Sequence, residues 1–421
     1  MIFKEYQDIP NEWELVRLDE IAEINPRKKK KIKKNGSWFE AKPEDLVTFL
    51  AMEDVSESSQ ILNKQIKHYS EVQKGYTSFQ EDDILIAKIT PCFENGKGAW
   101  AKDLNNGIGF GTTEFHVLRV QDDINKKWLH YLTSSYFFRK RGELNMQGSA
   151  GQKRIPTDFV KSYRLPKPSK EEQNNIAKIL STWDEAISKA EKLIKAKRRY
   201  KKGLMQRLLS PNPSGQASKL RFPKFEGEEW VEVKLKKFFK SFSVKNKDNE
   251  NLPILSCSKV YGITLQSNIF DKRVASKDIQ RYKVIEKNDL IYDPMLLWDA
   301  SIGFLKEVDR GVISPAYNTF KFKQDSGYRP FFEYLFDTHY MKYNYKAISQ
   351  GTNRRRRKAP AEAFLKIDVK VPKSIEEQRK IAGIMGMVQN EVDLLNKEVE
   401  LLKRQKKGLM QKLLTGKVRV K

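Results

Sequence analysis

One long segment occurs twice in this chain of 421 residues, and this repeat constrains the fold more than any other feature. Residues 171–209 and 376–414 share EEQ, IA and KKGLMQ followed by LL, always 205 positions apart. In both copies apolar residues recur at steps of three and four over about five heptads, with charged residues between them. This period predicts two long amphipathic helices.

Each predicted helix would be about 60 Å long, at ~1.5 Å per residue. A helix of that length with a single apolar stripe needs a second stripe to cover it, and the other copy is the nearest one within the chain. We therefore expect an intramolecular coiled coil. The alternative is that each helix packs on its own domain, because periodicity does not name the partner.

The residues before each helix form the rest of the repeat. Residues 11–24 and 228–239 open alike, with NEWELVRL and EEWVEVKL. Late in each segment a glycine-containing turn carries a basic cluster, QGSAGQKRIP at 147–156 and SQGTNRRRRKAP at 349–360. Short β-like runs lie in between, so each segment is expected to form a mixed domain.

We therefore expect an α+β chain in four parts. Residues 1–165 form a first mixed α/β domain and residues 166–211 a spacer helix. Residues 212–371 form a second mixed α/β domain and residues 372–421 a second spacer helix.

The charge balance predicts an anionic partner. Lys and Arg number 80 against 54 for Asp and Glu, a net charge of +26. Nucleic acid is the leading candidate, an anionic membrane is the competitor, and a basic surface kept for solubility is the third possibility.

No long apolar run or apolar leader is present, so a cytoplasmic protein is expected. Cys92 and Cys257 are far apart, which favours neither a zinc site nor disulfides.

Stretches of both domains carry a family resemblance. In the first domain these are ILIAKITPCFENGKGAW at 84–100 and GFGTTEFHVLR at 109–119. In the second they are LPILSCSKVYGI at 252–263 and VISPAYNTFKF at 312–322. With the duplicated helix, the chain over essentially its whole length resembles the specificity subunit of type I restriction–modification systems.

The resemblance implies two target-recognition domains in inverted orientation, joined by two antiparallel helices and related by a pseudo-twofold axis. Each domain would read one half of a bipartite, asymmetric DNA site, and the helices would set the spacing between the halves. Two methyltransferase subunits would dock on the helices and supply the chemistry of AdoMet. Restriction subunits would add ATP and Mg. The chain itself would be non-catalytic, with no cofactor or metal of its own.

The two glycine-containing turns are the leading candidates for DNA contact. Arginine can contact phosphate or hold guanine through two hydrogen bonds, although a solvated charge run is the alternative. The residues concerned are Gln152, Lys153 and Arg154 in the first domain, and Arg354, Arg355, Arg356, Arg357 and Lys358 in the second.

The resemblance adds further candidates, for which a structural role is equally open. They are Lys88, Thr90, Lys97, Gly111, Thr112 and Thr113 in the first domain, and Tyr292, Ser314, Tyr317 and Asn318 in the second. The basic run RKKKKIKK at 27–34 is a candidate phosphate-binding loop or a solvated surface loop.

The sequence also bears on other classes of function. GIGFG at 107–111 and YDPM at 292–295 imitate motifs of an adenine methyltransferase, but the glycines do not open a helix after a strand. No P-loop occurs, and the four histidines lie singly. An adaptor that binds anionic proteins or membrane is the remaining class, with the basic helix 186–209 as its surface.

Overall fold

The computed structural model divides into two compact units. The first unit takes residues 1–191 and 398–421, and the second takes residues 192–397. The residues that the structure describes are 6, 9–28, 31–34, 37–149, 151–209, 220–271, 274–276, 278–351 and 357–420, with the backbone alone for 31–34, 37 and 38.

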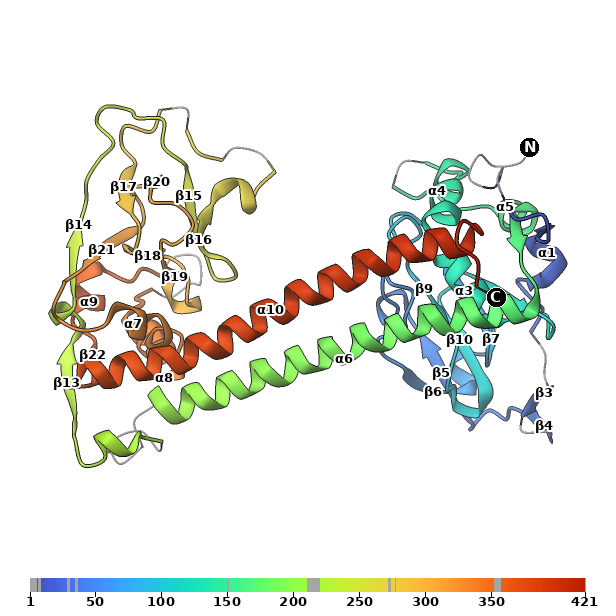
Figure 1. The fold of residues 1–421 in the computed structure, drawn as a ribbon, viewed down its shortest axis with the longest axis horizontal. Coiled ribbons are helices and arrows are strands. Elements are labelled where there is room, and N and C mark those ends of the chain that lie inside the picture. The colour runs from blue at the N-terminus through green and yellow to red at the C-terminus, as the bar shows by residue number, and fades with distance from the viewer. Residues whose placement is uncertain are drawn as a thin grey trace. The chain divides into compact units, whose positions relative to one another are not determined.

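The duplicated segments form two helices, as expected. Helix α6 spans Lys170–Leu209 and helix α10 spans Ile375–Leu414, each starting one residue before the predicted range (Figure 1). Both helices begin with paired glutamates in the first turn and have a basic residue in the last, which suits the helix dipole. By the division into units, each helix contributes to both.

Within each unit the two helices pack against each other in an antiparallel sense. As the residue number increases along α6, the number of its partner on α10 decreases. In the first unit the pairs are Asp184 with Lys406 at 2.6 Å and Glu191 with Lys403 at 2.8 Å. In the second unit they are Lys197 with Glu391 and Lys201 with Gln389, each at 2.5 Å.

The first unit contains two four-stranded sheets. One is antiparallel in the order β2-β11-β8-β9, and the other, in the order β6-β5-β10-β7, pairs β5 and β10 in parallel. Strands β1 and β12 pair separately, as do β3 and β4. The strands are β1 Glu14–Arg17, β2 Ala22–Ile24, β3 Lys31–Lys34, β4 Ser37–Glu40, β5 Leu46–Leu50, β6 Gln65–His68, β7 Thr77–Gln80, β8 Ile84–Ala87, β9 Gly98–Trp100, β10 Ile108–Gly111, β11 Phe115–Val120 and β12 Arg164–Lys167. The short helices are α1 Leu18–Ile21, α2 Tyr69–Val72, α3 Lys126–Ser134, α4 Tyr136–Leu144 and α5 Thr157–Ser162.

The second unit has one antiparallel four-stranded sheet in the order β14-β21-β18-β19, with three two-stranded pairs, β13-β22, β15-β16 and β17-β20. The strands are β13 Trp230–Lys234, β14 Phe239–Phe242, β15 Leu255–Ser258, β16 Gly262–Leu265, β17 Lys283–Glu286, β18 Leu290–Tyr292, β19 Ile302–Phe304, β20 Arg310–Ile313, β21 Asn318–Phe322 and β22 Asp368–Pro372. The short helices are α7 Arg329–Leu335, α8 His339–Ile348 and α9 Ala361–Leu365.

The repeat therefore extends beyond the long helices. The sheet order β2-β11-β8-β9 in the first unit corresponds to β14-β21-β18-β19 in the second, and α3, α4 and α5 correspond to α7, α8 and α9. The side chains that cap helices also correspond. Ser135 accepts a hydrogen bond from the amide of Phe138 at the start of α4, and Thr338 accepts one from Met341 at the start of α8. The loosely matching sequences of 11–24 and 228–239 thus belong to two copies of one architecture.

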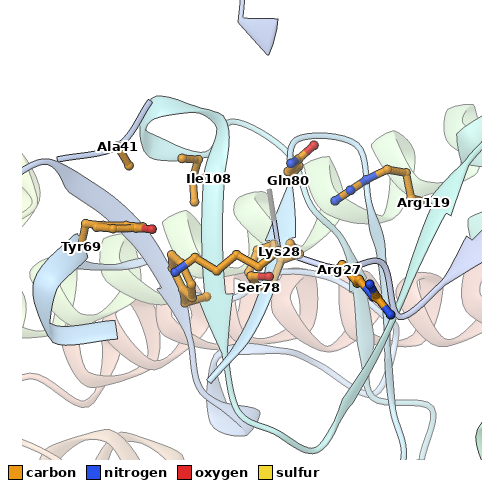
Figure 2. A pocket seen from close by; sticks show the side chains of 10 residues that line it. Arg27, Lys28, Ala41, Tyr69, Ser78, Gln80, Ile108 and Arg119 are labelled. Carbon is orange, nitrogen blue, oxygen red and sulfur yellow. The ribbon is translucent and has the colours of Figure 1, made fainter. Parts of the chain in front are cut away.

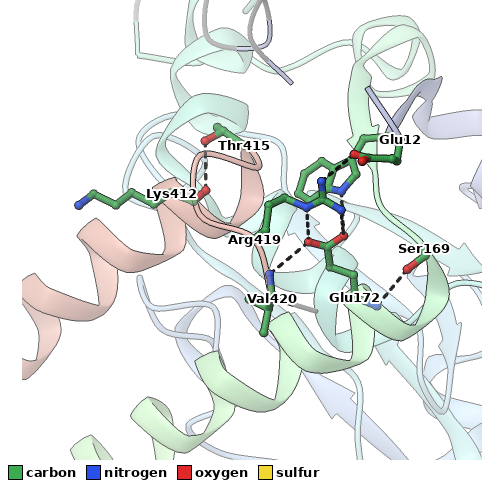
Figure 3. Close-up of polar contacts among 8 residues, drawn as sticks. Glu12, Ser169, Glu172, Lys412, Thr415, Arg419 and Val420 are labelled. Carbon is green, nitrogen blue, oxygen red and sulfur yellow. Dashed lines mark hydrogen bonds and ion pairs between the residues drawn. The ribbon is translucent and has the colours of Figure 1, made fainter. Parts of the chain in front are cut away.

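A buried glutamate at the start of each long helix fixes that helix to its unit. Glu172 of α6 accepts two hydrogen bonds from Arg419, at 2.7 and 3.0 Å, and one from the indole of Trp13 at 2.9 Å. Figure 3 shows Arg419 between Glu172 and Glu12, with the backbone amide of Val420 also directed at Glu172.

The second unit repeats this arrangement. Glu377 of α10 accepts hydrogen bonds from Arg221, at 3.1 and 2.8 Å, and from the indole of Trp230 at 3.4 Å. Arg221 follows α6 in the sequence KLRF at 219–222, and Arg419 follows α10 in KVRV at 417–420. In each unit, the arginine that pairs with the buried glutamate of one long helix therefore lies just after the other long helix.

Candidate nucleic-acid interface

Three predicted segments of the first unit meet at one end of the sheet β2-β11-β8-β9. The amide of Lys88, just past β8, donates to Glu114 O at 2.9 Å, and Lys88 O accepts from Ile155 at 2.9 Å. The amide of Thr90 donates to Lys153 O at 2.9 Å. Backbone pairing thus joins the end of β8, the turn before β11 and the glycine-containing turn.

The glycine-containing turn is closed by a backbone bridge and presents polar side chains. Gln147 and Arg154 exchange backbone hydrogen bonds of 2.9 and 2.8 Å, and Gln152 and Lys153 between them are exposed. The guanidinium of Arg154 forms a two-pronged ion pair with Glu114, with contacts of 2.9 and 3.0 Å, which raises the pKa of Arg154. Sequence reasoning missed Glu114. The turn can offer amide, ammonium and guanidinium donors to an anion or a base edge.

Among the other candidates in this unit, Thr113 is exposed, Gly111 is buried and the rest are partly buried. Lys97 donates to Met52 O at 2.9 Å, the hydroxyl of Thr90 donates to the carboxylate of Glu94, and burial lowers the pKa of Lys88. These contacts hold Thr90 and Lys97 against the protein. A base contact by either side chain would require these bonds to be exchanged.

The turn between β10 and β11 approaches its neighbour closely. A Cβ atom on Gly111 would lie 2.7 Å from Leu50 O of β5, so the turn needs glycine at this position. The amide of Thr112 donates to the same carbonyl at 3.3 Å, and Thr113 is exposed. Gly111 is thus explained by packing, while Thr113 is the member of this group that is open to a ligand.

One buried arginine supports the segment after β8, and sequence reasoning missed it. Arg139 of α4 is 7% exposed, and its guanidinium donates to Phe93 O at 3.3 Å and Gly96 O at 3.4 Å. It also lies over the ring of Phe93, 4.9 Å from the centroid. An arginine on an amphipathic helix ordinarily indicates a solvent-facing position, so the sequence held no signal for this role.

The second unit closes its glycine-containing turn in the same way. Gln350 and Lys358 exchange backbone hydrogen bonds of 3.0 and 2.9 Å, and Ala359 donates to Pro294 O at 2.9 Å. Lys358 therefore corresponds to Arg154 of the first unit. The guanidinium of Arg357 lies 5.7 Å from the ring of Trp298, while the candidates Arg354, Arg355 and Arg356 lie outside the described residues.

Two of the remaining candidates meet at the carbonyl of Ala359. The hydroxyl of Tyr292 donates to it at 3.0 Å, and the side-chain amide of Asn318 donates at 3.3 Å. Tyr292 is 0% exposed and stacks on Phe320, and burial raises its pKa, so the structure places it in the core and not on a reading surface. Its hydroxyl holds Ala359, near the end of the glycine-containing turn at 349–360, against the core.

Ser314 and Tyr317 lie in the turn between β20 and β21. The amide of Tyr317 donates to Ser314 O at 3.2 Å, and Tyr317 O accepts from Lys283 at 2.6 Å. Both side chains are partly buried, and burial raises the pKa of Tyr317. They adjoin Asn318 in sequence.

A small cationic pocket in the first unit involves the start of the basic run 27–34. Its volume is only about 20 Å³, and Figure 2 shows Arg27, Lys28 and Arg119 among the side chains that line it. Lys28 lies 4.6 Å from the ring centroid of Tyr69, and Arg119 is held by Asp83 at 2.7 and 3.1 Å. Two of its three cations thus have partners within the unit, and the pocket adds positive charge beside the sheet that contains β10.

Neither a metal centre nor a membrane span is found in the part of the chain that the structure describes. No group of three or more His, Cys, Asp or Glu side chains there could hold a metal ion. Within the same residues, every helix is too short or too polar to cross a bilayer.

Comparisons with known proteins bear on what these surfaces do. Residues 10–198 match the family model described as the type I restriction modification DNA specificity domain. The specificity subunit of the type I restriction enzyme EcoAI of Escherichia coli is 44% identical over 171 residues, which are 40% of this chain and 27% of that subunit. The match thus spans about a quarter of that relative.

Two further proteins match over nearly the whole chain. The specificity subunit of the type I restriction enzyme MjaVIII of Methanocaldococcus jannaschii is 25% identical over 433 aligned residues, 98% of this chain and 94% of that one. The crystal structure of the type I restriction–modification S subunit from M. genitalium shares the fold, with a TM-score of 0.55, 17% identity and 98% of both chains covered. Residues 10–198 are thus similar to the type I restriction modification DNA specificity domain, and over nearly its whole length the chain has the fold of the S subunit from M. genitalium.

Proposed function

We propose that this chain is the sequence-reading, non-catalytic subunit of a type I restriction–modification complex. Each unit would read one half of a bipartite, asymmetric DNA site. The observation that carries the proposal is the repeated architecture, in which the same sheet order supports a glycine-containing basic turn at the same place. Two units that share a scaffold but differ in their loops suit one task performed on two different half-sites.

The long helices would act as spacer and docking surface. Several large apolar side chains on them are exposed, including Leu193, Tyr200, Met387 and Leu394 at 45, 58, 61 and 65%. Exposed apolar groups gathered on a helix pair suit a protein partner. We propose two methyltransferase subunits, which bring AdoMet, as the partners, with restriction subunits that bring ATP and Mg. The net charge of +26 suits DNA as the third partner.

Methylation mapping tests the proposal. The chain is co-expressed with a type I methyltransferase subunit, and the modified DNA is sequenced. A split motif with two short specified halves is the expected result, and exchange of residues 217–371 for those of another family member should alter one half alone. Methylation by this chain without the subunit would instead mean an enzyme, and the absence of methylation and of salt-sensitive DNA binding would leave the adaptor class.

The spacer role has its own test. One helical turn is inserted at matching positions of α6 and α10, and the methylated sites are mapped again. The unread gap should change while both half-sites keep their sequence, because the turn adds about 5.4 Å to each helix. An unchanged gap would show that the helices do not set the spacing.

A further inference from the structure

Two loops of the second unit carry exposed apolar side chains that lie near cations. The turn between β15 and β16 carries Val260 and Tyr261, which are 79 and 63% exposed. The loop after β18 carries Met295 and Leu296, which are 42 and 44% exposed. We call these four residues the apolar tip. Water is a poor environment for so many adjacent apolar groups, and patches of this kind usually mark a binding site.

Polar contacts tie the two loops of the apolar tip together. Lys259, next to Val260, forms an ion pair of 2.6 Å with Asp299 of the second loop. The indole of Trp298 donates to Met295 O at 3.0 Å, which fixes the loop on itself. Tyr261 and Ala300 line the same cleft. The ion pair between Lys259 and Asp299 therefore links the two segments that carry the tip.

Arg357 and Lys358, at the end of the glycine-containing turn of the second unit, adjoin this surface. Arg357 lies over the ring of Trp298, and Ala359 donates to Pro294 O, the residue before Met295. Lys358 lies between them in sequence, and the run from 354 to 357 is four arginines. An apolar surface with Arg357 and Lys358 beside it suits a partner that combines anionic groups with flat apolar ones. Duplex DNA, with phosphates outside and base edges in its grooves, has both.

We propose that the apolar tip makes non-polar contacts with base edges in the half-site read by the second unit, while Arg357 and Lys358 contact the adjacent phosphates. The proposal rests on the proposed function. Thymine methyl groups and exposed faces of a base step are the groups that such side chains contact. The tip would then add sequence discrimination, and the turn would add affinity that depends on salt.

The test compares four variants of the full chain in complex with methyltransferase subunits, on duplexes that carry the mapped site. Val260→Ser with Tyr261→Ser should weaken specific binding about 10- to 100-fold through loss of apolar base contacts, with no change in the salt dependence. Arg357→Gln should weaken specific and random duplexes alike and lower the slope of log K against log salt by about one. Val244→Ser, at a valine 57% exposed elsewhere in the unit, is the control.

Duplexes with one altered half-site separate the outcomes. The double serine variant should lose discrimination in the second unit's half-site and keep it in the other, and Tyr261→Phe should retain both. Equal discrimination by the variant and the original chain would overturn the inference, as would loss of methyltransferase binding with DNA recognition intact. If the original chain does not discriminate between duplexes at all, the proposed function itself fails.

Discussion

Lys406 of α10 forms an ion pair with Asp184 of α6, with 2.6 Å between Nζ and Oδ1. The hydroxyl of Tyr131 on α3 donates to the second oxygen of Asp184 at 2.6 Å. The two long helices and a short helix of the first unit thus meet at one carboxylate. The positions that correspond in the second unit are Lys201 and Gln389, so the same junction there has a neutral amide in place of the acid.

We expect the two junctions to differ in strength. Asp184→Asn should lower the free energy of unfolding by about 1–3 kcal/mol, because Lys406 and Tyr131 lose a charged acceptor at a partly buried site. A double-mutant cycle with Lys406→Met, followed by urea unfolding, measures the coupling. The cycle of Lys201→Met with Gln389→Met should give a smaller coupling. Equal coupling in both units would show that the carboxylate adds nothing.

Arg419 should be essential to the stability of the first unit. Arg419→Met removes the charged partner of Glu172, whose side chain is 6% exposed, and should cost about 3 kcal/mol or more. Burial acts to raise the pKa of Glu172, but hydrogen bonds from Arg419 and Trp13 outweigh it, and the pKa is lowered. Its contribution is therefore present above the pKa of the unfolded state and lost as pH falls through the folded pKa.

In Arg419→Met burial should outweigh the remaining hydrogen bonds from Trp13 and the Val420 amide and raise the pKa of Glu172. The difference in the free energy of unfolding between the variant and the original chain should therefore narrow as pH falls from 7.5 to 5. Urea unfolding at both pH values measures the gap. Lys417→Met, at an exposed lysine in the same segment, is the control and should have little effect. A gap that does not change with pH would contradict the role of Glu172.

Two buried histidines should make the first unit sensitive to acid. Burial lowers the pKa of His116 and of His130 to about 4. Since the unfolded value is about 6.5, the unfolded state binds more protons between these limits, and stability falls as pH drops through this window. The full effect is on the order of 3 kcal/mol for each histidine.

The histidine prediction is checked by unfolding between pH 4.5 and 8. His130→Gln removes one of the two groups, so the slope of stability against pH should flatten by roughly half between 4.5 and 6.5. Above pH 7 the slope of the original chain and the variant should agree. An identical slope at low pH would show that His130 does not titrate in this range.

Arg139 should control the order of the segment between β8 and β9. Arg139→Met keeps most of the side-chain volume but removes the donors to Phe93 O and Gly96 O, and should speed amide hydrogen exchange in residues 90–98. Arg139→Lys should rescue this only in part, because a lysine lacks the planar fork. In methylation maps the half-site of the first unit should become less defined while the other half stays sharp. Lys342→Met, at the corresponding position of α8, is the control.

The parts of the fold set by continuous periodicity could be predicted. Both long helices were placed to within one residue, because their apolar steps recur over most of their length and the two copies match in sequence. The correspondence of the two glycine-containing turns is confirmed by their backbone bridges, Gln147 with Arg154 and Gln350 with Lys358.

The individual roles of side chains were harder to predict. A tyrosine at the end of a strand suits either a core or a surface, and Tyr292 lies in the core because Ala359 O accepts its hydroxyl. The partners of Glu172 and Arg139 are distant in sequence or are backbone carbonyls, so no spacing points to them. The matching KLR and KVR segments were a signal that could have led to Arg419. The assignment of individual residues to DNA stays a prediction.

The lock between Glu172 and Arg419 has a consequence for synthesis on the ribosome. The carboxylate and its arginine are 247 positions apart, and the first unit needs residues 398–421 to be complete. The second unit is contiguous, from residue 192 to residue 397. The second unit can therefore fold before the first one, although its translation starts later. The unit translated first lacks Arg419, the charged partner of Glu172, until residues 398–421 have been synthesised.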